Sequence, residues 1–459
     1  MRKNLYIFIL LLISSIGIAS AQLNLKKVFG RLNNTPSEQP TEVKKINYYS
    51  SGKTYYVNAS IAKGDGLSPN TALNSLQKAI NLAENGSTIK VAAGNYFEEG
   101  LNNNGKYLRI YGGYSADFSE RDFTKYITKI QPSNKVKSIG KPLFTLTTSK
   151  VNFEAESVLN GFVFDLGEWS IYNSIACEND KKGLLSGKLI EKNVQTTCST
   201  IGSSLEEVIA LNINVCGHTV IENNVFVNCK KYGIQGKSIE GLIDIRNNVF
   251  VACRYAACEI TGTADKEDKT QLNFHHNTVL FTWTKSSATE EFGQGFRYMN
   301  GIRKINVYNN IFACNSRCAV ERKQIESSRS LEKLKENSLY DNCFFANKYD
   351  LEVYRDGKIL AFPPSKIVDA EEIAPKYSGN KEFVYNEIFF AAIDKNYLKY
   401  FLYSNMKNKV ENANVKQFCT SLGIADTKTS KNPMFANKYP VDKALKLFGV
   451  GGTYGAQGK

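Results

Sequence analysis

One short phrase occurs twice in the chain, and it constrains the fold more than any other feature. Residues 220–229 read VIENNVFVNC and residues 244–253 read DIRNNVFVAC, so seven of ten positions agree. Related phrases follow as HHNTVLFTW (275–283), YNNIFACN (308–315) and DNCFFAN (341–347). Self-similarity of this kind is typical of a repeat protein.

The equivalent asparagines of these phrases are separated by 24, 29, 33 and 32 residues, and they are Asn224, Asn248, Asn277, Asn310 and Asn342. Such intervals are typical of one coil of a parallel β-helix, because longer ones fit where a loop leaves the coil. Stacked coils lie about 4.8 Å apart, so an asparagine at one bend can bond to the asparagines above and below it. We predict an asparagine ladder whose neighbouring Val, Phe and Ile side chains point into a continuous core.

Two segments look helical rather than repetitive. Residues 71–83 carry apolar residues on one helical face, and Asn85-Gly86 follows as a stop signal. Solenoids need caps at their ends, so we predict that this helix caps the N-terminal coil. Residues 385–423 predict a late helical elaboration, and NPMFAN (432–437) predicts a final coil.

Several of these segments carry a family resemblance. The stretches TYYVNAS (54–60), GDGLSPNTALNSLQKAINLAENGSTIKVAAGNYFEE (64–99), GGYSADFSERD (112–122) and NPMFANKYP (432–440) resemble exported right-handed parallel β-helix repeat proteins of the Bacteroidota, in the pectate-lyase-like superfamily. The resemblance implies an all-β solenoid over residues 54–449. It implies no single function, because this architecture hosts lyases, polygalacturonases, epimerases and proteins without known catalysis.

The N-terminus predicts export. Arg2 and Lys3 precede an apolar stretch from Leu5 to Ile18, and a small-residue cleavage site ends at Ala21. This pattern is typical of a signal peptide over residues 1–21. Residues 22–53 are predicted to be a linker, and residues 450–459 a polar tail. The expected location is across the inner membrane, in the periplasm, at the cell surface or outside the cell, with no transmembrane segment in the mature chain.

The charge of the chain favours anionic partners. The formal net charge is +14 and the isoelectric point is near 9.1. An acidic polysaccharide is the predicted partner, and cell-envelope proteins are further candidates. Lys and Arg are spread along the chain instead of forming one run, which argues against nucleic acid. The ten cysteines predict disulfides in an exported protein, although cysteines inside apolar strands are also typical of core packing.

The residues that follow each asparagine turn predict a ligand-binding strip. If the coils stack, basic and tyrosine side chains of successive segments fall along one lateral face, with Glu259 and Glu321 farther along it. Arginine forks match carboxylates and sulfates, and tyrosine rings pack on sugar faces. A solvated face of mixed charge is the alternative. The predicted substrate-binding residues are Lys231, Tyr232, Lys285 and Arg317.

Catalysis on such a strip would be proton abstraction beside a uronate carboxylate, followed by β-elimination. This reaction needs a group that neutralises the carboxylate and a base. The coils lack the aspartate cluster of calcium-dependent relatives, so we predict no metal and no other cofactor. The predicted catalytic residues are Arg254 and Arg297 for neutralisation, and Tyr255, Tyr298 or a neighbouring lysine for proton transfer. The segment EEFGQGFRYMNGIRK (290–304) is either a binding loop that exposes Arg297 and Tyr298 or a turn before a strand.

Two functions follow from these patterns. The first is an enzyme that cleaves an acidic polysaccharide by metal-independent β-elimination. The second is a glycan-binding or cell-surface complex subunit without catalysis, which is favoured because no acid/base pair stands out on adjacent coils. Glycoside hydrolysis is disfavoured because the coils lack an Asp-Asp pair. Of His275 and His276, alternation sends one inward and one outward; either could be a base near Arg254 or a surface residue. Whether the chain is an enzyme is left open.

Overall fold

The structure is a computed structural model of the whole chain. It describes residues 52–61, 64–98, 100–132, 141–148, 156–167, 209–263, 269–282, 293–315, 317–323, 336–345, 347–355, 357–363, 366–372, 376–382 and 439–458. The predicted signal peptide, most of the linker, the helical elaboration at 385–423 and the coil at 432–437 lie outside these residues, as does Lys285.

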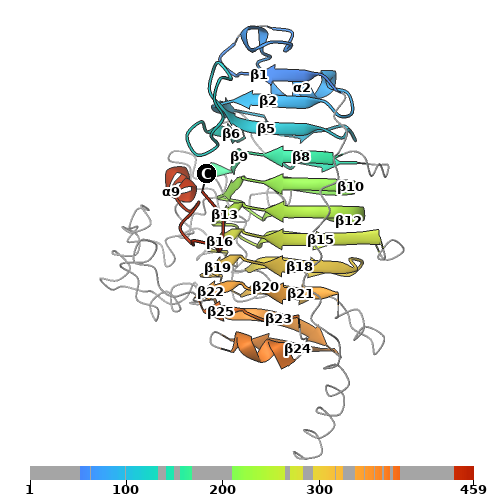
Figure 1. Cartoon of the computed structure of the whole chain (residues 1–459), viewed down its shortest axis with the longest axis vertical. Helices are drawn as coiled ribbons and strands as arrows, with labels where there is room; N and C mark the ends of the chain where they lie inside the picture. Colours follow the sequence, from blue (N-terminus) through green and yellow to red (C-terminus); the bar gives the residue numbers. More distant parts are fainter. Residues whose placement is uncertain are drawn as a thin grey trace, which may run out of the picture.

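The chain folds into a parallel β-helix, whose coils stack along one long axis (Figure 1). Its described strands form one sheet of sixteen strands and one of nine. Neighbouring strands pair in parallel throughout, except that β24 (Lys358–Phe362) runs antiparallel to β23 (Tyr349–Arg355) at the C-terminal end of the stack. The predicted fold class is therefore confirmed.

The large sheet splits into two sides of the β-helix, because the two halves of one long strand pair with different neighbours. The first half of β12 (Tyr232–Arg246) pairs with β14 (Ala256–Thr261), and its second half pairs with β15 (Thr270–His275). We call the first the β14 face, which continues through β17 (Gln294–Met299), β20 (Cys318–Lys323) and β23. The second is the β15 face, which continues through β18 (Lys304–Tyr308) and β21 (Asn337–Tyr340).

The remaining strands complete the coils. In the large sheet they are β1 (Thr54–Val57), β2 (Thr88–Ala92), β4 (Leu101–Asn102), β5 (Arg109–Tyr114), β7 (Phe144–Thr147), β8 (Glu156–Asn160) and β10 (Leu211–Glu222). The nine-stranded sheet consists of β3 (Gly94–Tyr96), β6 (Thr128–Ile130), β9 (Phe162–Asp165), β11 (Val225–Val227), β13 (Val249–Val251), β16 (Thr278–Leu280), β19 (Ile311–Ala313), β22 (Cys343–Phe345) and β25 (Lys381–Glu382).

The asparagine ladder is confirmed at the bend between the β15 face and the nine-stranded sheet. Each Nδ2 donates to the Oδ1 of the next rung at 2.9–3.2 Å, from Asn224 through Asn248, Asn277, Asn310 and Asn342. The ladder extends one coil beyond the prediction, because Asn342 donates to Asn380 at 3.0 Å. These side chains are buried, so the ladder satisfies amides that would otherwise be costly inside the protein.

The residue before each rung has a different task. Asn223, Asn247, His276, Asn309 and Asp341 all have φ between 51° and 60°. Asn, Asp and His are the side chains that tolerate this left-handed conformation best. The first asparagine of each Asn-Asn pair therefore turns the chain, and the second builds the ladder.

The strands of the nine-stranded sheet are apolar on both faces. Phe226 points into the coil and stacks on Phe250 with ring centroids 4.9 Å apart. Val225 and Val227 belong to a separate apolar layer on the other face of the same strands. The prediction that Val and Phe both point inward was therefore wrong for the valines, because strand residues alternate.

The C-terminal segment covers this second layer. Helix α9 (Val441–Leu445) and the residues around it pack on the valines of β11 and β13, beside the nine-stranded sheet (Figure 1). The backbone of Tyr439 exchanges two hydrogen bonds with the side chain of Asn228. Gly455 donates to the carbonyl of Asn309 at 2.8 Å. The tail expected from residue 450 onward thus packs against the coils as far as Gln457, whose backbone amide donates to the side chain of Asn247.

Helix α2 (Leu76–Leu82) caps the N-terminal coil, as predicted, with Leu76, Ala79 and Ile80 in the core. It begins later than expected, because Ser75 accepts from the backbone of Lys78 as the N-cap. Residues 69–71 form the short 3-10 helix η1 (Pro69–Thr71) instead, and a second one, η7 (Ile367–Glu372), lies near the other end. Among the described residues, no helix is long and apolar enough to cross a bilayer.

Candidate functional site

The β14 face carries a row of charged residues in register across its strands. The pairing aligns Gln235, Glu259, Arg297, Glu321 and Glu352 on five successive strands. All but Gln235 are buried. We call these five residues the central row. The prediction that Glu259 and Glu321 share one strip is thus confirmed by the strand register.

Arg297 bridges two carboxylates of the central row. Its Nη1 lies 3.0 Å from Oε2 of Glu259, and its Nε forms an ion pair with Glu321. The side chain of Gln235 donates to Glu259 at 2.8 Å, and that of Gln294 donates to Glu321 at 2.9 Å. The guanidinium is therefore committed to partners inside the protein.

The carboxylates of the row differ in their electrostatics. Burial raises the pKa of Glu321, and the charges of Arg297 and Arg317 only partly offset this. Glu352 accepts from Nε of Arg317 at 2.8 Å. The row is thus a network of ion pairs that largely neutralise one another, and such networks hold geometry more than they attract ligands.

The structure places the predicted catalytic residues mostly out of reach of solvent. Arg254 is fully buried just before β14, and Tyr298 is 2% exposed within the core. The segment that carries Arg297 and Tyr298 is strand β17 itself, instead of a loop or the turn before a strand. Tyr255 is buried except for 8% of its surface and packs edge-on against Tyr232. The catalytic roles of these residues stay predictions.

Lysines at the two ends of the β14-face strands lie over tyrosine rings. The ammonium of Lys231 is 5.6 Å from the ring centroid of Tyr232 and 5.7 Å from that of Tyr255. Two more such pairs lie farther down the stack: Lys348 over Tyr349 at 5.6 Å and Lys323 over Tyr354 at 5.9 Å.

These lysines differ from the arginines of the same face. Lys231, Lys323 and Lys348 are half-buried, and none has a carboxylate within ion-pairing distance in the part of the chain that the structure describes. Arg297 and Arg317 are both paired with glutamates. The positive charge of the β14 face that is not paired with glutamates therefore comes from these lysines. Of the three, only Lys231 was predicted as a binding residue from the sequence.

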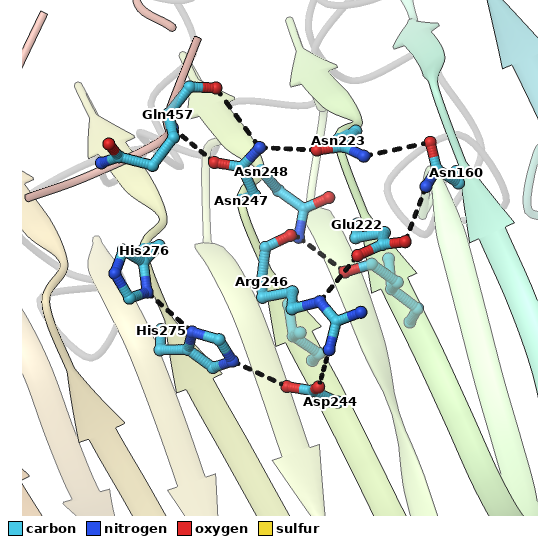
Figure 2. Close-up of polar contacts among 12 residues, drawn as sticks. Asn160, Glu222, Asn223, Asp244, Arg246, Asn247, Asn248, His275, His276 and Gln457 are labelled. Atoms are coloured by element: carbon cyan, nitrogen blue, oxygen red, sulfur yellow. Dashed lines mark hydrogen bonds and ion pairs between the residues drawn. The ribbon is translucent and has the colours of Figure 1, made fainter. Parts of the chain in front are cut away.

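A second polar cluster lies on the β15 face (Figure 2). Arg246 contacts Glu222 through Nε at 2.6 Å and Asp244 through Nη1. His275 faces Asp244 with Nε2 3.0 Å from Oδ1, and its Nδ1 faces Nδ1 of His276 at 2.8 Å. The ring of His275 also stacks on Tyr308 of the next coil, with centroids 4.5 Å apart.

The histidine nitrogens of the second cluster are all engaged by neighbouring side chains within the cluster. Both nitrogens of His275 have partners, and Nε2 of His276 lies 3.3 Å from Nδ2 of Asn309. His276 occupies the left-handed position of its turn, and both histidines are half-buried, so strand alternation does not send one inward and the other outward as expected. His275 is on the β15 face and Arg254 precedes the β14 face, so the two do not form the predicted base and its neighbour. Among the described residues, no three His, Cys, Asp or Glu side chains gather as metal ligands would.

The chain is weakly similar to several solved structures, among them a pectate lyase and a protein bound to xylose. Pectate lyase Pel9A is 12% identical, with 68% of this chain and 79% of that chain covered and a TM-score of 0.24. XylC, solved as a complex with xylose, is 9% identical, with 72% and 82% covered and a TM-score of 0.23. No family model and no curated protein matches the sequence. The class of protein, a parallel β-helix, is defined by the strand pairing itself.

Proposed function

We propose that this protein binds an acidic polysaccharide along the β14 face. The observation that carries the proposal is the set of lysine–tyrosine pairs formed by Lys231, Lys323 and Lys348, whose ammonium groups have no carboxylate partner among the described residues. An unpaired ammonium attracts carboxylates and sulfates. The half-buried rings of Tyr349 and Tyr354 add an apolar surface with a hydroxyl, which suits a sugar, whereas the rings of Tyr232 and Tyr255 are buried and support Lys231 from below.

The coil geometry supports an extended ligand. The pair of Lys231 precedes β12 and the pair of Lys348 precedes β23, four strands farther along the β14 face. At about 4.8 Å per strand, a ligand that meets both pairs must span several sugar units. The central row lies between the two ends of the β14-face strands, where the lysines are. Its ion pairs hold the side chains of this part of the surface in place. A linear glycan can therefore meet several lysine–tyrosine pairs at once, which adds avidity without requiring a deep pocket.

Binding fits this geometry better than catalysis. Uronate neutralisation needs a cation free to meet the substrate, yet Arg297 is bound to two glutamates and Arg254 is buried. β-Elimination is retained as a second candidate because the ammonium of Lys231 lies over the ring of Tyr255. Such a pair would combine a positive charge with a hydroxyl that can move a proton.

The proposed place of this binding is outside the inner membrane. The support is the sequence pattern of residues 1–21. Mass spectrometry of the protein recovered from its native host should find Gln22 as the first residue. Protein that keeps Met1 and is recovered in the cytoplasmic fraction would overturn this part of the proposal.

Retention by immobilised polysaccharide tests the binding. The wild type is expected to be retained by polyuronates or sulfated glycans, to be released by salt because surface charges are screened, and to pass through neutral glycans. The triple variant Lys231→Ala, Lys323→Ala, Lys348→Ala should lose affinity on the order of tenfold or more. Lys446→Ala removes an exposed lysine beside the nine-stranded sheet and is the matched control.

Two outcomes would overturn the proposal: equal retention of the triple variant and the control, or equal retention on neutral glycans. Ultraviolet absorbance of unsaturated uronates in the same mixtures tests elimination. A lyase should lose this signal in Tyr255→Phe, which removes one hydroxyl, while that variant is still retained. Retention without any absorbance would leave binding as the function.

A further inference from the structure

Two cysteines occupy equivalent positions one coil apart. Cys229 and Cys253 each lie two residues beyond the aligned strands β11 and β13, in which Val227 pairs with Val251. The amide of Arg254 donates to the carbonyl of Cys229 at 3.0 Å, so the register continues past the strands. Both side chains are fully buried, and neither sulfur is joined to another cysteine in the structure.

These cysteines stand in a second ladder, at the bend that leads to the β14 face. Farther down the stack the same column contains Thr282, Asn315 and Asn347. There the hydroxyl of Thr282 donates to Asn315 at 2.7 Å, and Nδ2 of Asn315 donates to Asn347 at 2.8 Å. Polar side chains thus join each coil of this column to the next.

The two cysteines continue the column with sulfur atoms. Each thiol donates to a backbone carbonyl of the same pair of coils, Cys229 to Val227 at 3.7 Å and Cys253 to Phe226 at 3.9 Å. Adjacent strands of a sheet are 4.7–4.9 Å apart, and disulfides form between Cα atoms about 4.4–6.8 Å apart. Stacked positions with side chains on the same side therefore meet the distance requirement for a covalent bond.

We propose that Cys229 and Cys253 form a disulfide between consecutive coils. The oxidant is a small-molecule or protein disulfide, and it reacts with the two thiols by thiol–disulfide exchange. One thiolate attacks the oxidant and releases one thiol; the second thiolate then attacks the mixed disulfide and releases the other. In total two Cys thiols lose two protons and two electrons, one S–S bond forms, and the oxidant is reduced to two thiols.

The bond should form while the chain folds. Burial raises the pKa of the Cys229 thiol, so little thiolate exists once the coils have closed. Complete burial also keeps an oxidant away from the native pair. Oxidation in the unfolded or partly folded chain, followed by closure of the coils, avoids both obstacles.

Refolding of the full chain in a glutathione redox buffer tests the proposal. Peptide mapping without reduction should then find Cys229 joined to Cys253, with the joined peptides lighter by two hydrogen atoms than the free pair. Cys258 is the internal control, because it is fully buried but pairs in register with Ile234 and Phe296 instead of another cysteine. It should remain free and be alkylated after denaturation.

Stability supplies a second readout. The oxidised protein should unfold at a higher temperature than the reduced protein, and this difference should vanish in Cys253→Ser. Recovery of Cys229 and Cys253 as separately alkylated residues after refolding would overturn the proposal. Disulfides of either residue with another cysteine would overturn it as well.

Discussion

The rings of His275 and His276 share one hydrogen bond, with their Nδ1 atoms 2.8 Å apart. The carboxylate of Asp244 accepts from Nε2 of His275, so a neutral His275 offers Nδ1 as an acceptor. His276 must then donate from Nδ1 and accept from Asn309 at Nε2. The chain of hydrogen bonds is therefore complete only when both rings are neutral (Figure 2).

This arrangement predicts a loss of stability at mildly acidic pH. Burial, followed by the neighbouring His275, lowers the pKa of His276 to about 4. The unfolded chain binds a proton there near pH 6.5, so between these values the unfolded state holds more protons and stability falls as the pH is lowered. His276→Asn preserves the left-handed turn, as Asn247 and Asn309 show, and should flatten this slope. Urea unfolding at pH 7 and pH 4.5 measures it; equal slopes in both proteins would contradict the assignment.

The two asparagines of each turn should respond differently to substitution. Asn248→Ala removes the oxygen that accepts from the backbone and side chain of Asn224, and those groups are buried. We expect a loss of about 2–4 kcal/mol in the free energy of unfolding. Asn223→Gly keeps the positive φ and should cost about 1 kcal/mol or less. Chemical denaturation of both variants checks the contrast, and equal losses would show that the two positions have one task.

Removal of Arg297 should strengthen the pH dependence that Glu321 gives to the stability of the protein. Arg297→Met leaves Glu259 and Glu321 buried without their shared cation, which should cost about 3–5 kcal/mol near neutral pH. Burial already raises the pKa of Glu321, and the variant raises it further. When folding raises the pKa of a carboxyl group, the protein loses stability as the pH increases from the unfolded-state pKa to the folded-state pKa.

Denaturation of Arg297→Met should therefore show a smaller deficit relative to wild type at pH 5 than at pH 7. Lys446→Ala, an exposed control, should show no deficit at either pH. A deficit that is constant with pH would mean that Glu321 does not take up the proton.

Removal of the C-terminal segment should uncover an apolar surface. A chain that ends before Tyr439 exposes the outward side chains of the nine-stranded sheet, including Val227, Val251 and Leu280. Contiguous apolar patches of this kind promote association. We expect the truncated chain to bind a hydrophobic dye and to form oligomers in light scattering, whereas Tyr439→Phe should remain monodisperse. A monodisperse truncated chain would contradict the covering role.

Local patterns were enough to predict the coils. Three Asn-Asn pairs, together with His276-Asn277 and Asp341-Asn342, predicted five rungs of the ladder, because the left-handed turn favours Asn, Asp or His and the stacking amide is that of asparagine. Asn380 was missed because glycine, at Gly379, takes the turning position there. The alternation of Val225, Phe226 and Val227 contained the signal for a covering segment, since valines on an outer face imply something apolar above them.

The site was less predictable, for a physical reason. Which residues meet across the β14 face depends on register, and register depends on how each loop returns the chain to the stack. The sequence placed Arg297 in a strip but could not show that Glu259 and Glu321 align on both sides of it. A cation and its two partners lie 38 and 24 residues apart in the chain, so no local pattern links them.

The covering of the nine-stranded sheet by α9 has a consequence for the order of events in synthesis. Asn228 and its hydrogen-bond partner Tyr439 are separated by 211 residues in the sequence. A chain emerging from the ribosome can stack its early coils, but the outer valines of the nine-stranded sheet stay uncovered until residues 439–458 have been synthesised. During that interval we expect the growing chain to be prone to association at this surface.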